Sequence, residues 1–292
     1  MSVIALAACG DNDDAVPIPI EPTPSPRLLT VEVSENPMDN EEACARVMNR
    51  TTAATTTASL SSFTMNYTDA WYNTFNKESS GWSTVTWPDD VGNDTPIDFY
   101  AHDGGTFQWN DGNPYLNFTM NNDAFNQKDL LVATHKQISY NDTKGVVSLT
   151  FDHACAAVQF QICQTKKVTD EGKNFIINSI VLKNVRKNGD YYYDSGWTLG
   201  SDRTNYTLTN ILENTLTSTL EKTSILTTDY QPLPCKWLFL IPQSQDGIQL
   251  EIKYTIDGGA EEKTKVLNVG TGNWEQGKQY TVNIRVGSSF LS

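Results

Sequence analysis

Cysteine and histidine are the residues of this chain best suited to nucleophilic or metal chemistry, so their spacing comes first. The five cysteines are Cys9, Cys44, Cys155, Cys163 and Cys235. None of them forms the close pairs typical of a zinc site. The histidines, His102, His135 and His153, fall in separate expected strands, with no spacing that brings two of them to one metal. We therefore expect no metal, no cofactor and no catalytic residue, and calcium on an acidic loop is left open as a minor alternative.

Cys155 and Cys163 lie eight residues apart in what reads as one extended strand, so we expect them to be too far apart to bridge. Buried or free thiols are the interpretation we favour for them and for Cys235. Cys9 is different, because it follows a short apolar run that ends in Ala7 and Ala8. This arrangement resembles the bacterial lipobox, in which the cysteine thiol receives a lipid and the peptide before it is removed.

The residues after Cys9 form an acidic and proline-rich stretch. Asp11, Asp13 and Asp14 come first, and five prolines occur between Pro17 and Pro26. Such a segment cannot build a core and favours an extended, stiff conformation. We interpret residues 1–9 as the end of a lipoprotein signal and residues 10–27 as a spacer. A chance alanine-rich start is the alternative for the first segment.

The charge of the chain excludes one large class of partners. It carries 21 basic and 35 acidic residues, a net charge of −14 at pH 7. A surface of this sign repels phosphates, so we expect no binding to nucleic acid. The length of 292 residues and the hydrophobic content of 38% suffice for one large or two medium globular domains.

Alternation of apolar and polar residues is the dominant pattern of the body. Apolar residues occupy the even positions from Ile248 to Ile256, a pattern that predicts a strand with one buried face. The same period predicts strands around residues 63–67, 147–151, 158–162 and 280–286, and an early strand over Leu28 to Ser34. The turn formers between them are Asp103-Gly104-Gly105, Asp111-Gly112-Asn113, Asn188-Gly189, Asp246-Gly247 and Asp257-Gly258-Gly259. Many short strands separated by turns predict an all-β sandwich architecture. The spacing of Leu212, Leu216 and Leu220 leaves that region ambiguous.

Seven tryptophans raise the question of sugar binding, because exposed aromatic rings stack on sugars. Trp71, Trp82, Trp87 and Trp109 fall in the first half of the chain, among Asn, Asp and Gly residues. Packing in a core is the usual fate of such side chains and is the interpretation we prefer.

Several segments, taken in order, resemble the fimbrillin family of Bacteroidales, whose members are subunits and accessory proteins of cell-surface fimbriae. The segments are Ile97 to His102, Lys128 to Ala133, Val147 to Val158, Ile177 to Asn184, Gly189-Asp190-Tyr191 with Trp197, Leu238 to Pro242, and Asn273 to Tyr280. The resemblance implies two tandem transthyretin-like Greek-key β-sandwich domains, which we place at residues 28–145 and 146–292.

The resemblance also implies assembly by strand exchange. In that process a protease cuts after an arginine near the N-terminus, the first strand leaves, and a strand of the next subunit fills the groove. The candidates for the cut are Arg50 and Arg46, and ordinary surface charge is the alternative for both. The candidate removable strand contains Leu28, Leu29, Val31 and Val33. The candidate donor strand contains Val282, Ile284, Val286 and Phe290, and the alternative is that it completes its own domain.

The function that follows from this resemblance is that of a structural or accessory subunit of fimbriae that supports adhesion. We expect export as a lipoprotein with lipid on Cys9, location at the outer membrane and in the fimbrium, and other fimbrial subunits as partners in a homo- or hetero-polymer. A host protein or glycan is a further partner consistent with adhesion. The alternative is a surface glycan-binding lipoprotein of a polysaccharide-uptake system.

Overall fold

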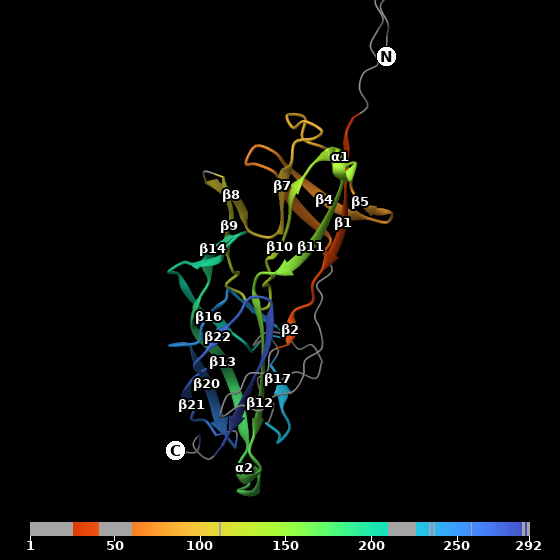
Figure 1. The fold of residues 1–292 in the computed structure, drawn as a ribbon. Coiled ribbons are helices and arrows are strands. Elements are labelled where there is room, and N and C mark those ends of the chain that lie inside the picture. Colours follow the sequence, from red (N-terminus) through yellow and green to blue (C-terminus); the bar gives the residue numbers. More distant parts are fainter. Residues whose placement is uncertain are drawn as a thin grey trace, which may run out of the picture.

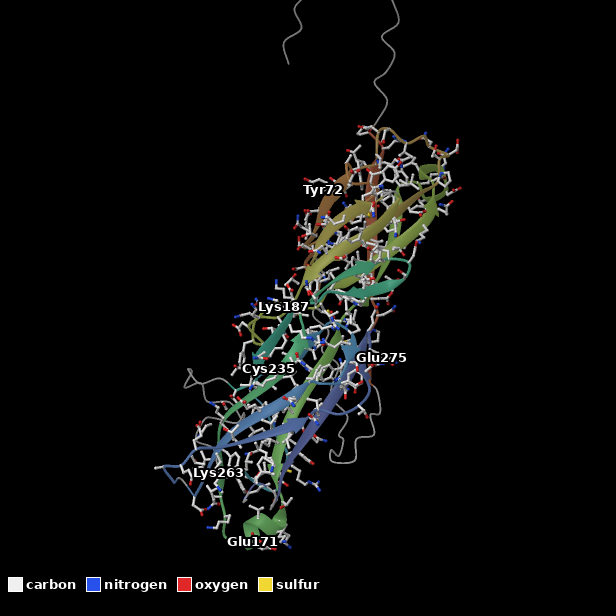
Figure 2. The ribbon with its side chains drawn as sticks, turned by 90° about the vertical axis from the view of Figure 1, so that its left-hand side faces the viewer. Tyr72, Glu171, Lys187, Cys235, Lys263 and Glu275 are labelled. Carbon is white, nitrogen blue, oxygen red and sulfur yellow. The ribbon has the colours of Figure 1, made fainter. Side chains whose placement is uncertain are left out.

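The protein is a long body of β-sheets, with strands from both halves of the chain arranged along its length (Figure 1). The computed structural model describes residues 26–40, 60–110, 112–209, 226–233, 235, 237–257, 259–287 and 290. Figure 2 shows Tyr72 near one end of the body, Lys187 near its middle and Glu171 at the other end. Cys9, Cys44, Arg46, Arg50 and the ambiguous leucines from Leu212 to Leu220 lie outside the described residues.

The elements of the first half are β1 (Leu28–Glu35), β2 (Asp39–Asn40), β3 (Ser62–Asn66), β4 (Tyr72–Glu78), β5 (Gly81–Trp82), β6 (Val85–Thr86), β7 (Ile97–Asp103), β8 (Thr106–Asn110), β9 (Asn113–Thr119), β10 (Leu131–Ile138), α1 (Tyr140–Thr143) and β11 (Val146–His153). Those of the second half are β12 (Ala156–Gln164), α2 (Lys166–Asp170), β13 (Phe175–Arg186), β14 (Asn188–Tyr192), β15 (Gly196–Leu199), β16 (Arg203–Thr207), β17 (Gln231–Pro232), β18 (Leu238–Leu240), β19 (Gln243–Ser244), β20 (Gln249–Ile256), β21 (Lys263–Asn268), β22 (Asn273–Trp274) and β23 (Lys278–Val286).

The strands predicted from alternation are confirmed. In β20 the side chains of Leu250, Ile252 and Tyr254 are buried, while the residues between them are partly exposed. The early strand is β1, and the other predicted strands are β3, β11, β12 and β23. The all-β class is therefore confirmed. The arrangement as two transthyretin-like sandwiches stays a prediction.

One predicted turn is wrong. Asn188 and Gly189 do not form a turn but begin β14, which pairs with β9 and β15. The glycine serves close packing there, because a Cβ atom at Gly189 would lie 2.8 Å from the carbonyl oxygen of Thr198 on the neighbouring strand. Glycine within a strand commonly marks such a close backbone approach.

An eight-stranded sheet dominates the first half, in the order β5-β4-β3-β7-β10-β11-β1-β6. The second half contains a sheet in the order β17-β12-β23-β2, with β18 also paired to β12, and a sheet in the order β16-β13-β20-β21. Only Ala154 and Cys155 separate β11 from β12, although the two strands belong to different sheets. Together they form a spine along the body, visible in green in Figure 1.

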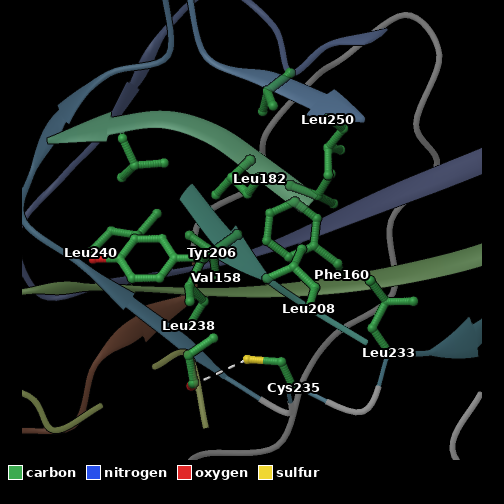
Figure 3. Close-up of a cluster of buried hydrophobic side chains, with 14 of the residues drawn as sticks. Val158, Phe160, Leu182, Tyr206, Leu208, Leu233, Cys235, Leu238, Leu240 and Leu250 are labelled. Atoms are coloured by element: carbon green, nitrogen blue, oxygen red, sulfur yellow. Dashed lines mark hydrogen bonds between the residues drawn. The ribbon is translucent and has the colours of Figure 1, made fainter. Parts of the chain in front are cut away.

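Two hydrophobic cores lie along this spine. The smaller core includes Leu29, Phe63, Phe99, Leu149 and Phe151. The larger core includes residues of β12, β13, β20 and β23, part of which Figure 3 shows around Val158, Phe160 and Leu250. The inward side chains of β11 thus pack with the first half of the chain. The domain limits 28–145 and 146–292 stay a prediction.

An antiparallel four-stranded sheet joins the two halves, in the order β15-β14-β9-β8. β9 comes from the first half and β14 from the second, and they pair over five residues. Nearby, the indole nitrogen of Trp197 donates a hydrogen bond to the carbonyl oxygen of Ala154 on the spine, at 2.7 Å. Backbone pairing and this side-chain contact therefore tie the halves together.

The prediction for three of the cysteines is confirmed. Cys155, Cys163 and Cys235 are all buried and free. The thiol of Cys235 points toward the carbonyl oxygen of Ala124 at 3.5 Å, beside the larger core (Figure 3). Burial raises the pKa of the Cys235 thiol to about 12, with a smaller contribution from the charge of Asp123. Because a thiol that stays protonated is a poor nucleophile, we interpret Cys235 as a packing residue.

Candidate functional site

The histidines predicted to lie apart do so, on β7, β10 and β11. Among the described residues, no group of three His, Cys, Asp or Glu side chains is placed to hold a metal ion. The tryptophans that raised the question of sugar binding serve largely in packing. Trp87 is fully buried, Trp71 packs on Phe99 and Trp82 packs on Phe63.

The candidate removable strand, β1, lies near one edge of the eight-stranded sheet. It pairs in parallel with β11 over six residues and antiparallel with β6 over two. Leu29 is fully buried in the smaller core, and the half-buried Val31 and Val33 pack against it. Leu28 is 52% exposed on the opposite face. Burial of a leucine side chain contributes about 2 kcal/mol, so β1 is anchored mainly by Leu29.

The outward face of β1 forms a row of polar contacts with β11. The hydroxyl of Ser148 donates to the carboxylate of Glu32 at 3.1 Å. Two positions further on, the hydroxyls of Ser34 and Thr150 are 3.0 Å apart. These contacts lie at alternate residues, as the two-residue period of a strand requires.

The start of β1 is held by a close backbone approach and by an arginine. The amide of Thr30 donates to the carbonyl oxygen of Gly145 at 2.8 Å. A Cβ atom at Gly145, where φ is +83°, would lie 2.0 Å from the carbonyl oxygen of Leu28. The guanidinium of Arg27 donates to the carbonyl oxygens of Pro88 and Val91 at 2.7 and 2.6 Å.

Sequence reasoning missed Arg27 as an anchor. Its acceptors lie 61 and 64 residues away along the chain, and only the fold brings them together. Arg27 was predicted as the last residue of the proline-rich spacer over residues 10–27, whose composition carried no signal of this role.

Beyond β1, the chain runs from the first half to the second. The amide nitrogen of Asn36 donates to the carbonyl oxygen of Phe151 at 2.8 Å, and its side chain donates to the carboxylate of Asp152 at 2.7 Å. After Pro37 the chain enters β2, which pairs in parallel with the start of β23. We call residues 26–40 the N-terminal segment. It thus contacts the sheets of both halves.

A polar pocket of about 370 Å³ lies where the N-terminal segment crosses between the halves. We call it the junction pocket, and it is lined by Asn36, Pro37, Asp152, His153, Gln276 and Gly277. Only two of these residues, Asn36 and Pro37, belong to the N-terminal segment. Its departure would therefore remove one wall of the pocket.

His153 forms a buried ion pair beside this pocket. Its Nδ1 atom lies 2.5 Å from the carboxylate of Asp129, and both side chains are 5% exposed. Burial alone would lower the pKa of His153, but the hydrogen bond and charge of Asp129 outweigh it, with help from Glu35 and Asp152, and the pKa is raised. The other Asp129 oxygen accepts from the amide of Cys155 at 3.1 Å. The pair therefore ties the end of β11 to the segment that precedes β10.

The candidate donor strand, β23, lies inside its own sheet. It pairs in parallel with β12 over eight residues. Val282, Ile284 and Val286 are buried in the larger core, and Phe290 is buried beyond them. The hydroxyl of Tyr254 donates to the carbonyl oxygen of Phe290 at 2.6 Å. This arrangement agrees with the alternative in which the strand completes its own domain. The role of β23 as a donor strand stays a prediction.

Nothing among the described helices has the length and apolar character required to span a membrane.

The sequence matches the fimbrillin-like family over residues 33–291. Because the match covers most of the chain, the protein belongs to this family, as the ordered segments predicted. The family is a structural one and not a family of enzymes. A comparison with curated proteins finds no match.

Solved structures of similar fold come from Bacteroides. A fimbrial protein from Bacteroides vulgatus ATCC 8482 is 17% identical with a TM-score of 0.50, over 72% of this chain and 79% of that one. A putative cell adhesion protein from Bacteroides ovatus ATCC 8483 is 15% identical with a TM-score of 0.49, over 89% of this chain and 92% of that one. At this identity the first likeness shows a shared fold.

The close approach at Gly145 gives a test of how β1 is held. We expect Gly145→Ala to destabilise the protein by more than about 2 kcal/mol, because the left-handed φ disfavours alanine and the methyl group would displace Leu28. Gly112→Ala is the matched control, since Gly112 has a φ of +80° and no neighbour within 4 Å of an added Cβ atom. Urea unfolding and hydrogen exchange at the amide of Thr30 measure the difference. Equal losses in the two variants would contradict the assigned contact.

The two buried histidines give opposite predictions for pH. The raised pKa of His153 means that its stabilisation is complete below about pH 6.5, the unfolded value, and is lost as the pH rises through the folded value. Burial lowers the pKa of His102 more than its hydrogen bond to Gly104 raises it. His102 therefore stabilises the fold above about pH 6.5, and that contribution falls as the pH drops toward its folded value.

We expect His153→Gln to remove the decline in unfolding free energy above about pH 6.5, and His102→Gln to remove a decline below it. The measurement is urea unfolding at closely spaced pH values from 5 to 8.5, made on both variants and the unchanged protein. An unchanged slope above pH 6.5 in the His153→Gln variant would rule out the ion pair with Asp129.

Proposed function

We propose that this protein is a subunit of cell-surface fimbriae, exported as a lipoprotein and assembled with other subunits after proteolysis removes its N-terminal segment. The observation that carries the proposal is the place of β1 in the sheet. β1 fills the smaller core with Leu29 and pairs with β11, yet no hairpin joins the two strands. Membership in the fimbrillin-like family supports the same function.

Removal of β1 would leave a groove that another strand can fill. The departure of Leu29, Val31 and Val33 would expose an apolar trough in the smaller core. β11 would lose its pairing partner along one edge. Unpaired backbone groups and exposed apolar surface are both costly, and an added strand satisfies both together. The name of the similar protein from Bacteroides vulgatus, a fimbrial protein, supports a role in fimbriae.

In this proposal the chain accepts a strand from its neighbour. β23 supplies Val282, Ile284 and Val286 to the larger core, so donating it would open that core. The accepting role needs only that β1 departs. Donation of β23 is the alternative, and disulfides between introduced cysteines distinguish the two roles. A disulfide between Val33→Cys and Leu149→Cys would hold β1 in its sheet and should block assembly if β1 must leave. A disulfide between Val282→Cys and Phe160→Cys would hold β23 and should block assembly only if β23 is donated.

The proposed cut gives a prediction for limited proteolysis. We expect a trypsin-like protease to cut after Arg46 or Arg50 and to spare the bond after Arg27, because the Arg27 side chain is engaged by the loop at residues 88–93. The cleaved protein should then form ladders on gels. N-terminal sequencing and native gels of the unchanged protein and of an Arg46→Ala, Arg50→Ala double variant are the measurement.

A product that begins at Leu28, or a cleaved core that stays monomeric while it binds polysaccharide, would contradict this proposal. The second result would favour the glycan-binding alternative. The tryptophans placed in packing give that alternative no support of their own.

The proposed lipid anchor is tested at Cys9. We expect the Cys9→Ala protein to leave the membrane fraction, because the thiol that would carry the lipid is gone. Cys44→Ala is the control and should fractionate like the unchanged protein. If the Cys9→Ala protein stays with the membrane, the anchor lies elsewhere.

A further inference from the structure

Three contacts between the N-terminal segment and β11 recur at every second residue and differ in chemistry. The hydroxyl of Ser148 donates to the carboxylate of Glu32, and the hydroxyls of Thr150 and Ser34 are hydrogen-bonded to each other. The carboxylate of Asp152 accepts from the side-chain amide of Asn36. We call Ser148, Thr150 and Asp152 the outward row. It presents a hydroxyl donor, a second hydroxyl and a carboxylate acceptor in that order.

The inward face of β1 cannot define the register by itself. Its residues in the groove, Leu29, Val31 and Val33, are all aliphatic. A shift by one residue would turn them to the solvent, and the apolar groove excludes it. A shift by two residues keeps aliphatic side chains in most inward positions and preserves the backbone hydrogen bonds. The outward row adds a second constraint against that shifted state, in which Arg27 or Glu35 would also enter an inward position.

Charge adds to this distinction at Asp152. A shift by two residues toward the junction would place Ser34 opposite Asp152 and bring Glu32 opposite Thr150, one row from the Asp152 carboxylate. Like charges at neighbouring cross-strand positions are unfavourable. After β1 and Glu35 leave, the groove still holds the carboxylate of Asp129 close enough to act on His153. An incoming strand must therefore avoid a further acid there.

The junction pocket ends the strand at a defined place. The amide of Asn36 makes the last backbone bond to β11, at Phe151. Pro37 has no N–H group and cannot continue the ladder. Both residues line the pocket together with Asp152 and His153. The position that faces Asp152 is thus also the position at which pairing stops.

From these contacts we propose that the outward row and the junction pocket select which strand can replace β1 and in which register. The fitting ligand is an extended peptide with aliphatic residues facing inward. At successive outward positions it carries an acceptor, a hydroxyl and an amide donor, as Glu32, Ser34 and Asn36 do. This inference rests on the proposed function, since it concerns the strand that takes the place of β1.

The test uses the full-length protein after cleavage by a trypsin-like protease, incubated with fluorescent synthetic peptides. The reference peptide has the sequence of residues 26–40. Its Asn36→Asp variant places an acid against Asp152, and we expect its affinity to fall at least about tenfold, as loss of a hydrogen bond to a charged group with added repulsion requires. The Leu28→Ala peptide is the control, because Leu28 faces the solvent, and should bind within about twofold of the reference.

The complementary change is Asp152→Asn in the protein. It should restore binding of the Asn36→Asp peptide to within about threefold of the reference pair, because the repulsion is removed and an amide can donate to the introduced acid. A merely weakened groove would not give this rescue. Mass spectrometry after cross-linking reports the register of each bound peptide.

Equal binding of the reference and Asn36→Asp peptides, or a loss that Asp152→Asn does not restore, would overturn the selection by the outward row while strand replacement still occurs. If no peptide binds, including the reference peptide and the Leu28→Ala control, strand replacement itself fails and both proposals fall. The peptide variants leave the protein unchanged, so the first comparison does not depend on the folding of the Asp152→Asn variant.

Discussion

The parallel pairing of β1 with β11 is the constraint on which the rest of the structure depends. Parallel strands cannot be joined by a tight turn, and Ser34 and Thr150, which touch, are 116 residues apart in the sequence. β1 is therefore held by non-local contacts alone. Such a strand can leave its sheet without breaking a hairpin, and the intervening strands β3, β7 and β10 remain paired with one another or with β11.

The spine of β11 and β12 carries a parallel partner in each half, but the two partners differ in burial. β1 is anchored by Leu29, while Val31 and Val33 are half-buried. β23 places a continuous set of side chains in the larger core and pairs with β12 over eight residues. Because burial of apolar surface dominates stability, removing β1 costs less free energy than removing β23. The asymmetry makes β1 the parallel partner that is easier to remove.

The four-stranded sheet that joins the two halves explains why the loss of β1 need not separate them. β9 and β14 pair across the halves, and Trp197 binds the spine at Ala154. Tyr100 of β7 and Tyr193, just beyond β14, also lie with ring centroids 5.1 Å apart. These contacts involve neither the N-terminal segment nor β11. They therefore hold the two halves together independently of β1.

The sequence by itself determined the all-β class, the positions of six strands and the family. The strands could be located because alternation of side chains is a local property that burial imposes on each strand. It also indicated β1 as a separate early strand. The tertiary structure alone decided that β1 pairs with β11, that Arg27 binds the loop at residues 88–93 and that Gly189 lies within a strand. It likewise placed β11 with the first core and formed the pair of His153 and Asp129. Each of these features depends on contacts between residues far apart in the chain, which no local sequence pattern can predict. The contacts that define the proposed site are of the same kind.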